Sequence, residues 1–169
     1  MKPKIIIIDG PIGSGKSTVA NLLHKKMKKT IIIRLDRIKH LFSDYEGSPE
    51  NQQLSADIGK AMVKECVRKN INVIVEKAFT REEFIKSFIK GLEKKSKIYI
   101  YQLYAPIDIR EKRVKNRPIP NDAKKRPTIQ KIKKNTKNFE NFRYKNAIEF
   151  DSSKLTAKQV TNKILKDIR

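Results

Sequence analysis

The chain has 169 residues, of which 38% are hydrophobic and 34% charged, and its formal net charge is +22. This length suits one domain with a sizeable core, and the single cysteine, Cys66, excludes a disulfide within the chain, as is usual in a reducing compartment. The apolar run near the N-terminus holds only four Ile, too few for a signal sequence or a membrane span, so we expect a cytoplasmic protein without membrane contact, either monomer or homodimer.

Apolar runs alternate with helical patterns along the chain. Short apolar runs, typical of strands buried on both faces, predict strands at residues 4–9, 30–36, 72–76, 97–104 and 146–151. Helical spacing and helix-start signals predict helices at residues 16–29, 37–42, 52–69, 81–95, 105–118, 128–142 and 152–169. Strands separated by helices predict an α/β fold, with a five-stranded parallel sheet covered by helices on both faces.

The helix expected at residues 52–69 shows its apolar residues on one side. These residues, which we expect to face the core, are Leu54, Ile58, Met62, Val63, Cys66 and Val67. Cys66 in this position is expected to be a packing residue.

Glycine is concentrated at one point, with three of the six glycines within residues 10–15. The stretch DGPIGSGKST (residues 9–18) contains the pattern G-x-x-x-x-G-K-[ST] between a predicted strand and a predicted helix, as a phosphate-binding P-loop requires. Glycine lets several backbone N–H groups converge on phosphate, and the helix N-terminus adds its dipole. The residues expected to bind the nucleotide are Gly10, Pro11, Ile12, Gly13, Ser14, Gly15, Lys16, Ser17 and Thr18.

Within this loop, Lys16 is expected to reach the β- and γ-phosphates of ATP, and the Ser17 hydroxyl to bind Mg²⁺. The alternative, a glycine-rich turn with no ligand, would not need Lys16-Ser17 after the last glycine.

Three downstream segments strengthen this interpretation: RLDRIKHLF (34–42), VIVEKAFTRE (73–82) and APIDIREKRVKNRP (105–118). With the P-loop in this order, the chain resembles the small P-loop kinases of the nucleoside-monophosphate-kinase-like group over almost its whole length. That group includes polynucleotide 5′-hydroxyl kinases, chloramphenicol phosphotransferase and the zeta-toxin-like, AAA-33-type kinases. The resemblance implies a three-layer P-loop NTPase fold with strand order 2-3-1-4-5, one kinase domain over residues 1–169, and a helical lid at about 110–135.

Asp36 follows the second strand, at the sheet edge where open α/β folds bind ligands. In the resembling kinases an Asp here accepts the proton of the attacking hydroxyl, and a basic residue three positions later meets the acceptor, which implies these roles for Asp36 and Lys39. Family members more often carry Arg where Lys39 stands. Asp36 could also, or instead, cap the short helix at residues 37–42.

Glu76 ends the third strand, and the resemblance implies that it orients Mg²⁺ and its water or the acceptor. It could equally be an ordinary acidic residue at a strand end. Deoxynucleoside kinases carry Glu/Asp-Arg-Ser here, and this chain has Glu76-Lys77-Ala78. Arg81 is the nearest further basic residue and a candidate for binding the acceptor, and Thr80 is expected to begin the next helix.

Arg113 and Arg117 are four residues apart and so share one helix face, with Arg110 on the same side. The resemblance implies that this lid clamps the ATP phosphates and the transferring phosphoryl group, while closure excludes water. A solvated basic helix face is the alternative.

Residues 110–145 carry 14 Lys and Arg against three acidic residues, a net +11. This stretch could hold a polyanionic acceptor such as a nucleic-acid end, or only ATP, and the overall charge could also reflect a bias toward Lys. Phe139, Phe142 and Tyr144 could stack a base or simply pack the helix.

The loop after the fifth strand contains Ser152, Ser153 and Lys154. In the resembling kinases this loop lies beside the adenine of ATP, which makes these residues candidates for the base site. Ser153 or Thr156 could instead cap the last helix. The sequence therefore predicts a kinase that transfers the γ-phosphate of ATP to a hydroxyl, with Lys16, Asp36, Arg113 and Arg117 as the catalytic set. A nucleotide or deoxynucleoside kinase and a nucleic-acid-binding P-loop ATPase or switch are the alternatives.

Overall fold

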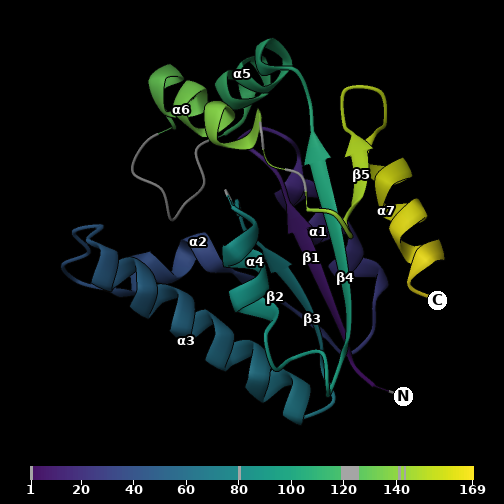
Figure 1. Ribbon diagram of the computed structural model, residues 1–169. Helices are drawn as coiled ribbons and strands as arrows, with labels where there is room; N and C mark the ends of the chain where they lie inside the picture. Colours follow the sequence, from purple (N-terminus) through teal and green to yellow (C-terminus); the bar gives the residue numbers. More distant parts are fainter. Residues whose placement is uncertain (1, 80, 119–125, 141, 143) are drawn as a thin grey trace.

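The computed structural model describes residues 2–79, 81–118, 126–140, 142 and 144–169. Five strands form one parallel sheet in the order β2-β3-β1-β4-β5, which confirms the predicted topology (Figure 1). The strands are β1 (Lys4–Asp9), β2 (Thr30–Arg34), β3 (Asn72–Glu76), β4 (Lys97–Tyr104) and β5 (Ile148–Asp151). The P-loop strand β1 lies at the centre of the sheet, so the loop that follows it has neighbouring strand ends on both sides.

The helices follow the strands in the predicted alternation. They are α1 (Lys16–Lys26), α2 (Leu35–Ile38) with the 3₁₀ turn η1 (Lys39–Leu41), α3 (Pro49–Arg68), α4 (Glu82–Ile89), α5 (Ile107–Asn116), α6 (Ile129–Glu140) and α7 (Ala157–Asp167). Figure 1 shows α5 and α6 together beyond the carboxyl end of β4. Within the described parts of the chain, no helix has the length and apolar character needed to cross a membrane.

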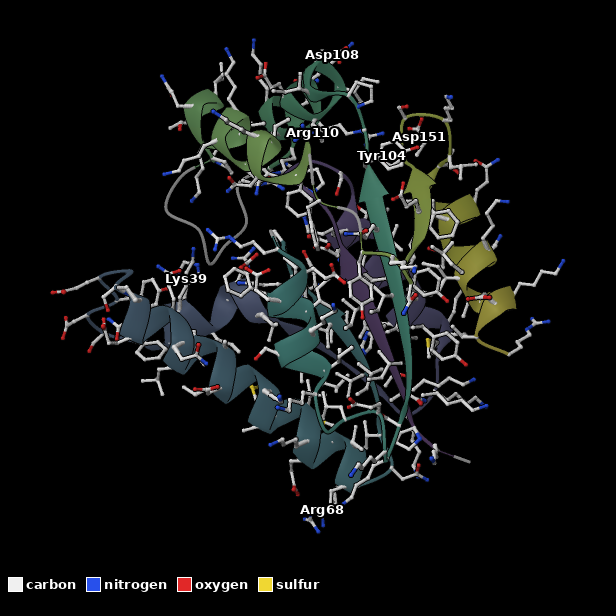
Figure 2. All side chains as sticks on the ribbon, viewed as in Figure 1. Lys39, Arg68, Tyr104, Asp108, Arg110 and Asp151 are labelled. Atoms are coloured by element: carbon white, nitrogen blue, oxygen red, sulfur yellow. The ribbon has the colours of Figure 1, made fainter. Side chains whose placement is uncertain are left out.

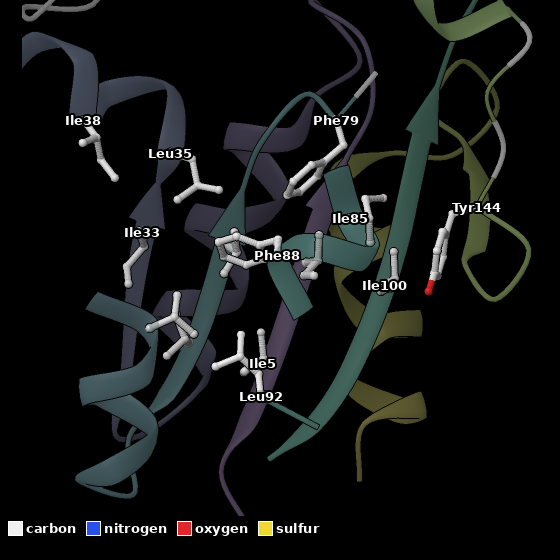
Figure 3. Close-up of a cluster of buried hydrophobic side chains, with 14 of the residues drawn as sticks. Ile5, Ile33, Leu35, Ile38, Phe79, Ile85, Phe88, Leu92, Ile100 and Tyr144 are labelled. Atoms are coloured by element: carbon white, nitrogen blue, oxygen red, sulfur yellow. The ribbon is translucent and has the colours of Figure 1, made fainter. Parts of the chain in front are cut away.

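The two faces of the sheet carry separate cores because the side chains of β1 alternate. Ile5 and Ile7 pack with the residues of α3 and α4, the cluster shown in Figure 3. Ile6 and Ile8 pack on the opposite face with residues of α1 and α7. All four isoleucines are fully buried, and burial of each contributes about 1.5–3 kcal/mol, which fixes β1 and thereby the start of the P-loop.

The prediction for the buried side of α3 was partly wrong. Leu54 and Met62 are 48% and 40% exposed, and the buried positions of this helix are Ser55, Gly59, Val63 and Val67. The reason is the close approach of α2. A Cβ on Gly59 would lie 2.3 Å from the Cδ2 atom of Leu35, so this position of α3 has no room for a larger residue.

The aromatic residues at the end of α6 and directly after it belong to the core. Phe139, Phe142 and Tyr144 are 5%, 7% and 8% exposed, and they join the cluster of Ile5 and Ile7. The backbone N–H of Tyr144 also donates to the Gln102 side chain on β4 over 2.9 Å. Of the two predicted alternatives, packing is therefore confirmed.

Substitution of Gly10 tests how tightly β4 confines the start of the P-loop. Gly10 has φ 141°, and an added Cβ would lie 2.0 Å from the carbonyl oxygen of Leu103. Gly91, at φ 84° with no atom within 4 Å of an added Cβ, is the matched control. We expect Gly91→Ala to lower the free energy of unfolding by about 1 kcal/mol and Gly10→Ala by about 3 kcal/mol or more, measured by urea unfolding. Equal losses would contradict the close packing of the loop on β4.

Candidate active site

The loop between β1 and α1 has the backbone path of a phosphate-binding loop. Gly10, Gly13 and Gly15 adopt φ angles of 141°, 84° and 94°, all in the region that favours glycine. Gly15 is the N-cap of α1, and no side chain caps this end of the helix. The N-terminal N–H groups of α1 are thus left to face an anion, as the sequence predicted.

Lys16 lies inside this loop, where it is 9% exposed and its Nζ donates to the carbonyl oxygens of Gly10 at 2.8 Å and Pro11 at 3.0 Å. Burial lowers the pKa of the ammonium group, while the carboxylates of Glu76, Asp36 and Asp9 act in the opposite direction. The negative charges of the three acids thus stabilise the buried ammonium group. Two of them, Asp36 and Glu76, are the acidic residues that the sequence predicted for the site.

Glu76 and Ser17 meet at the mouth of the loop. The Ser17 hydroxyl donates to Oε1 of Glu76 over 2.5 Å, and Oε2 of Glu76 accepts from Nε of Arg34 over 2.9 Å. Arg34 in turn donates to the Asn21 side chain on α1, so the position of Glu76 is fixed from two sides. Glu76 is therefore part of a network and not a solvated acid at a strand end.

The same pair fits a magnesium ion. Mg²⁺ prefers one or two protein oxygens together with phosphate oxygens and water, and a hydroxyl beside a carboxylate at the P-loop is such a set. In the described segments, no group of three or more His, Cys, Asp and Glu residues could hold a metal without other ligands. Ser17 and Glu76 would therefore hold Mg²⁺ only jointly with the nucleotide.

Asp36 lies in the first turn of α2, two residues beyond the end of β2. The cap of α2 is Arg34, without a side-chain hydrogen bond, so the alternative prediction that Asp36 caps this helix is wrong. Oδ1 of Asp36 instead accepts from Nζ of Lys77 at 2.7 Å. The Asp36 side chain is 53% exposed. Desolvation acts to raise its pKa, but Lys77, Lys16 and Lys39 outweigh this effect and the net pKa is lowered, so the group is a carboxylate at neutral pH.

The two lid arginines occupy different places. Arg113 donates to the hydroxyl and carbonyl oxygens of Ser152, at 3.0 and 2.6 Å, and so contacts the loop where the sequence predicts adenine. Arg117 lies near Glu76 and Arg37, and its pKa is lowered by burial and by the charge of Arg37. Its Nε is buried and has no hydrogen-bond partner among the described residues. Of the predicted pair, Arg117 is the one near the P-loop charges.

Arg110, which the sequence placed on the same face as Arg113, is buried at 2% exposure (Figure 2). It donates to the carbonyl oxygens of Ala105 and Ile12, at 2.8 and 3.0 Å, and to the Thr136 hydroxyl at 2.7 Å. The N–H of Ile12 donates to the Asn135 side chain at 2.7 Å. Both polar backbone groups of one P-loop residue are thus bound by α5 and α6, a connection that the sequence pattern did not indicate.

Asp9 is a further residue that sequence reasoning missed. It is fully buried, and its two oxygens accept from the Phe79 N–H and the Gln102 side chain, both at 2.8 Å. Burial raises its pKa to about 6, although these hydrogen bonds and the charge of Lys16 oppose the shift. The sequence signal that could have identified it is its position at the end of the first strand, directly before Gly10. Asp9 joins the ends of β1 and β4 to the segment after β3.

The remaining candidates lie apart from this centre. Arg81 is the N-cap of α4 and lies over the Phe84 ring, 5.7 Å from its centroid, with Glu83 3.7 Å away. Ser153 donates to Asp151, and Thr156 caps α7 in a capping box with Gln159, as one alternative predicted. The expected helix start at Thr80 lies outside the described residues.

A cavity of about 300 Å³ lies behind the P-loop, against α5, α6 and the ends of β4 and β5. Its lining includes Gly10, Tyr104, Arg110 and Asp151, labelled in part in Figure 2. Lys16, Asp36 and Glu76 do not line it. The candidate reaction centre is therefore a separate place, on the side of the P-loop that faces α2 and β3.

Comparison with known proteins identifies the family of the chain. A family profile described as an AAA domain, AAA_33, matches residues 5–142. The chain belongs to the AAA_33 family. No curated protein matches the chain.

Solved structures share the fold at low sequence identity. A chain of the Pnkp1/Rnl/Hen1 RNA repair complex is 21% identical with a TM-score of 0.70, over 84% of this chain and 47% of that one. This AAA_33 chain thus spans about half the length of that relative. The Deinococcus radiodurans tunicamycin resistance protein is 17% identical with a TM-score of 0.71, over 98% and 95% of the two chains. The Mycobacterium tuberculosis APS kinase CysC, in complex with AMPPNP and APS, is 16% identical with a TM-score of 0.72, over 98% and 96%.

Asp9 gives the AAA_33 chain a defined pH dependence. Folding raises the pKa of the Asp9 carboxyl from 3.8 to about 6, so the folded protein binds this proton more tightly than the unfolded chain does. The resulting stabilisation is fully present below the pKa of the unfolded chain and is lost as pH rises through the pKa of the folded protein. We expect the free energy of unfolding of the wild type, relative to Asp9→Asn, to fall by up to about 3 kcal/mol between about pH 4 and about pH 7. Urea unfolding at a series of pH values measures this difference. Parallel pH profiles for the two proteins would contradict it.

Proposed function

We propose that this chain is an ATP-dependent kinase that transfers the γ-phosphate to a hydroxyl group of its acceptor. The observation that carries the proposal is an ionised carboxylate, Asp36, near the P-loop lysine Lys16 on the acceptor side of the loop. Membership of the AAA_33 family and similarity in fold to an APS kinase support it. The single cysteine suits a reducing compartment, and we propose a cytoplasmic location.

Each residue of the centre has one physical task. The P-loop N–H groups and Lys16 bind the phosphates. To do so, Nζ of Lys16 gives up its hydrogen bonds to the carbonyl oxygens of Gly10 and Pro11 and donates to phosphate oxygens instead. Ser17 and Glu76 would hold Mg²⁺ through a hydroxyl and a carboxylate oxygen. Mg²⁺ would neutralise phosphate charge and orient the phosphate oxygens.

Asp36 acts mainly by alignment. Its lowered pKa makes it a weak base, but phosphoryl transfer has a loose transition state in which the hydroxyl proton leaves late. A fixed carboxylate can therefore accept a hydrogen bond from the hydroxyl, aim its oxygen at phosphorus, and take the proton as the new bond forms. Lys77, bound to Oδ1 at 2.7 Å, leaves Oδ2 for this contact.

The experiment that tests the proposal follows the label of γ-labelled ATP in the presence of a panel of nucleosides, sugars and 5′-hydroxyl oligonucleotides. A kinase moves the label into an organic product. The alternative from another class, a nucleic-acid-stimulated ATPase or switch, releases all of it as free phosphate, and that result would refute the proposal.

Asp36→Asn removes the carboxylate charge at nearly constant size. We expect kcat on the best acceptor to fall by about 100-fold with ATP affinity little changed, measured by single-turnover transfer and nucleotide binding. Asp57→Asn, an acid on α3 that accepts from Gln53, is the control and should keep wild-type transfer. Full transfer by Asp36→Asn would remove Asp36 from the reaction centre.

The separation of the lid arginines predicts different kinetic effects. Arg117, near Lys16 and Glu76, is expected to bind the transferring group, so Arg117→Ala should lower kcat by roughly 100-fold. Arg113, bonded to Ser152, is expected to act on nucleotide binding, so Arg113→Ala should chiefly raise the KM for ATP. Steady-state kinetics with ATP varied measures both. Identical changes in both variants would contradict separate roles.

A further inference from the structure

The P-loop conformation is costly for a free chain to hold. Gly10, Gly13 and Gly15 have φ angles of 141°, 84° and 94°, and glycine loses more conformational freedom on ordering than any other residue. A loop that becomes ordered only when its ligand arrives loses this entropy on binding, which weakens the affinity. Contacts that order the loop in the free protein therefore strengthen its binding of phosphate groups.

Hydrogen bonds within the loop hold it only in part. The Ser14 N–H donates to the carbonyl oxygen of Pro11 over 3.2 Å. The carbonyl oxygens of Gly10 and Pro11 also accept from Nζ of Lys16, at 2.8 and 3.0 Å. In the proposed reaction, Lys16 gives up these two bonds to bind phosphate. The first half of the loop then depends on contacts from outside to keep its shape.

Ile12 receives such contacts on both of its polar backbone groups. Its carbonyl oxygen accepts from Nη1 of Arg110 on α5 over 3.0 Å, and its N–H donates to the Asn135 side chain on α6 over 2.7 Å. The next residue, Gly13, lies so close to α5 that an added Cβ would be 2.8 Å from the carbonyl oxygen of Arg110. Neither hydrogen bond involves Lys16, so both can persist while Lys16 changes partners.

The Arg110 side chain is itself held from several sides. It is 2% exposed, and Figure 2 labels it where α5 and α6 meet. Its Nε donates to the carbonyl oxygen of Ala105 over 2.8 Å, and its Nη2 donates to the Thr136 hydroxyl over 2.7 Å. That hydroxyl donates in turn to the carbonyl oxygen of Ile132 within α6 over 2.8 Å. One buried guanidinium thus joins α5, α6 and the P-loop, and its charged hydrogen bonds are of the stronger kind.

We propose that Arg110 and Asn135 are positioning residues for the nucleotide, a role that rests on the proposed kinase function. They hold Ile12, and with it the N–H groups that follow, in the phosphate-binding conformation before ATP arrives and while Lys16 moves to the phosphates. Neither side chain touches the nucleotide in this role, since each acts through Ile12. The helices α5 and α6 then serve as a fixed support of the P-loop and do not swing away from it as a free lid.

Hydrogen exchange of the free protein tests the positioning itself. Asn135→Ala removes the acceptor of the Ile12 N–H, and we expect the amides of residues 12–15 to exchange roughly 10-fold faster than in the wild type. Asn135→Asp keeps an acceptor oxygen at the same place and should retain the wild-type rate. Asn138→Ala, at an exposed position of α6, has the same change in helix propensity and is the matched control. Wild-type exchange in Asn135→Ala would overturn the inference.

Nucleotide affinity is the second readout. In calorimetry with ADP and Mg²⁺, we expect Asn135→Ala to bind roughly 10-fold more weakly than the wild type, and Asn138→Ala to bind equally well. In the label-transfer assay, Asn135→Ala should raise the KM for ATP by a similar factor with kcat little changed, because the ordered loop acts on binding. A variant that is less stable but binds ADP as tightly as the wild type would show a structural role only, and would overturn the inference.

Arg110→Lys keeps the positive charge but cannot make the three bonds of the guanidinium. It should therefore weaken ADP binding at least as much as Asn135→Ala does. Because Arg110 is buried, folding of this variant is checked by circular dichroism, and the decision rests on Asn135→Ala.

The outcomes separate this inference from the kinase proposal. If the wild type binds ADP but transfers no label to any acceptor, the kinase function fails, and the exchange and affinity measurements still decide the role of Asn135. If the wild type transfers label and Asn135→Ala binds ADP normally, the inference alone fails. If the wild type binds no ADP, both fail.

Discussion

The buried ammonium of Lys16 is the constraint on which the site depends. A cation within the P-loop loses its hydration, which lowers its pKa, and it is retained because carboxylates lie near it. Those acids come from the ends of β1 and β3 and from the turn after β2, where the strand order β2-β3-β1 brings them together. The positions of Asp9, Asp36 and Glu76 around Lys16 therefore meet one electrostatic requirement.

A second set of contacts relates the loop to the lid. Arg110 and Asn135 bind both polar backbone groups of Ile12, so α5 and α6 are bound to the loop that we propose receives the phosphates. This explains why the cations on these helices take separate places. Arg117, the extended residue that directly follows α5, lies near Glu76, and Arg113 contacts the loop after β5.

Much of this could be predicted from the sequence because the signals are local. The isoleucine run of β1 indicates the central strand, and the glycine positions indicate the turn between β1 and α1 that the structure shows. The parts that were missed depend on tertiary contacts. Whether Arg110 is solvated or buried depends on the carbonyls it meets, and the partnership of Asp36 with Lys77 depends on the pairing of β2 with β3. The close packing of Gly59 on α2, which places a glycine on the buried side of α3, is likewise not encoded in the spacing of apolar residues.

The most direct measurement is a crystal structure of the protein with Mg²⁺, ADP, aluminium fluoride and the acceptor identified by label transfer. The account predicts that Nζ of Lys16 leaves the Gly10 carbonyl for the fluoride, and that an oxygen of Asp36 lies within about 3 Å of the acceptor hydroxyl. A complex in which Lys16 keeps its carbonyl contacts, and Asp36 touches no acceptor atom, would contradict it.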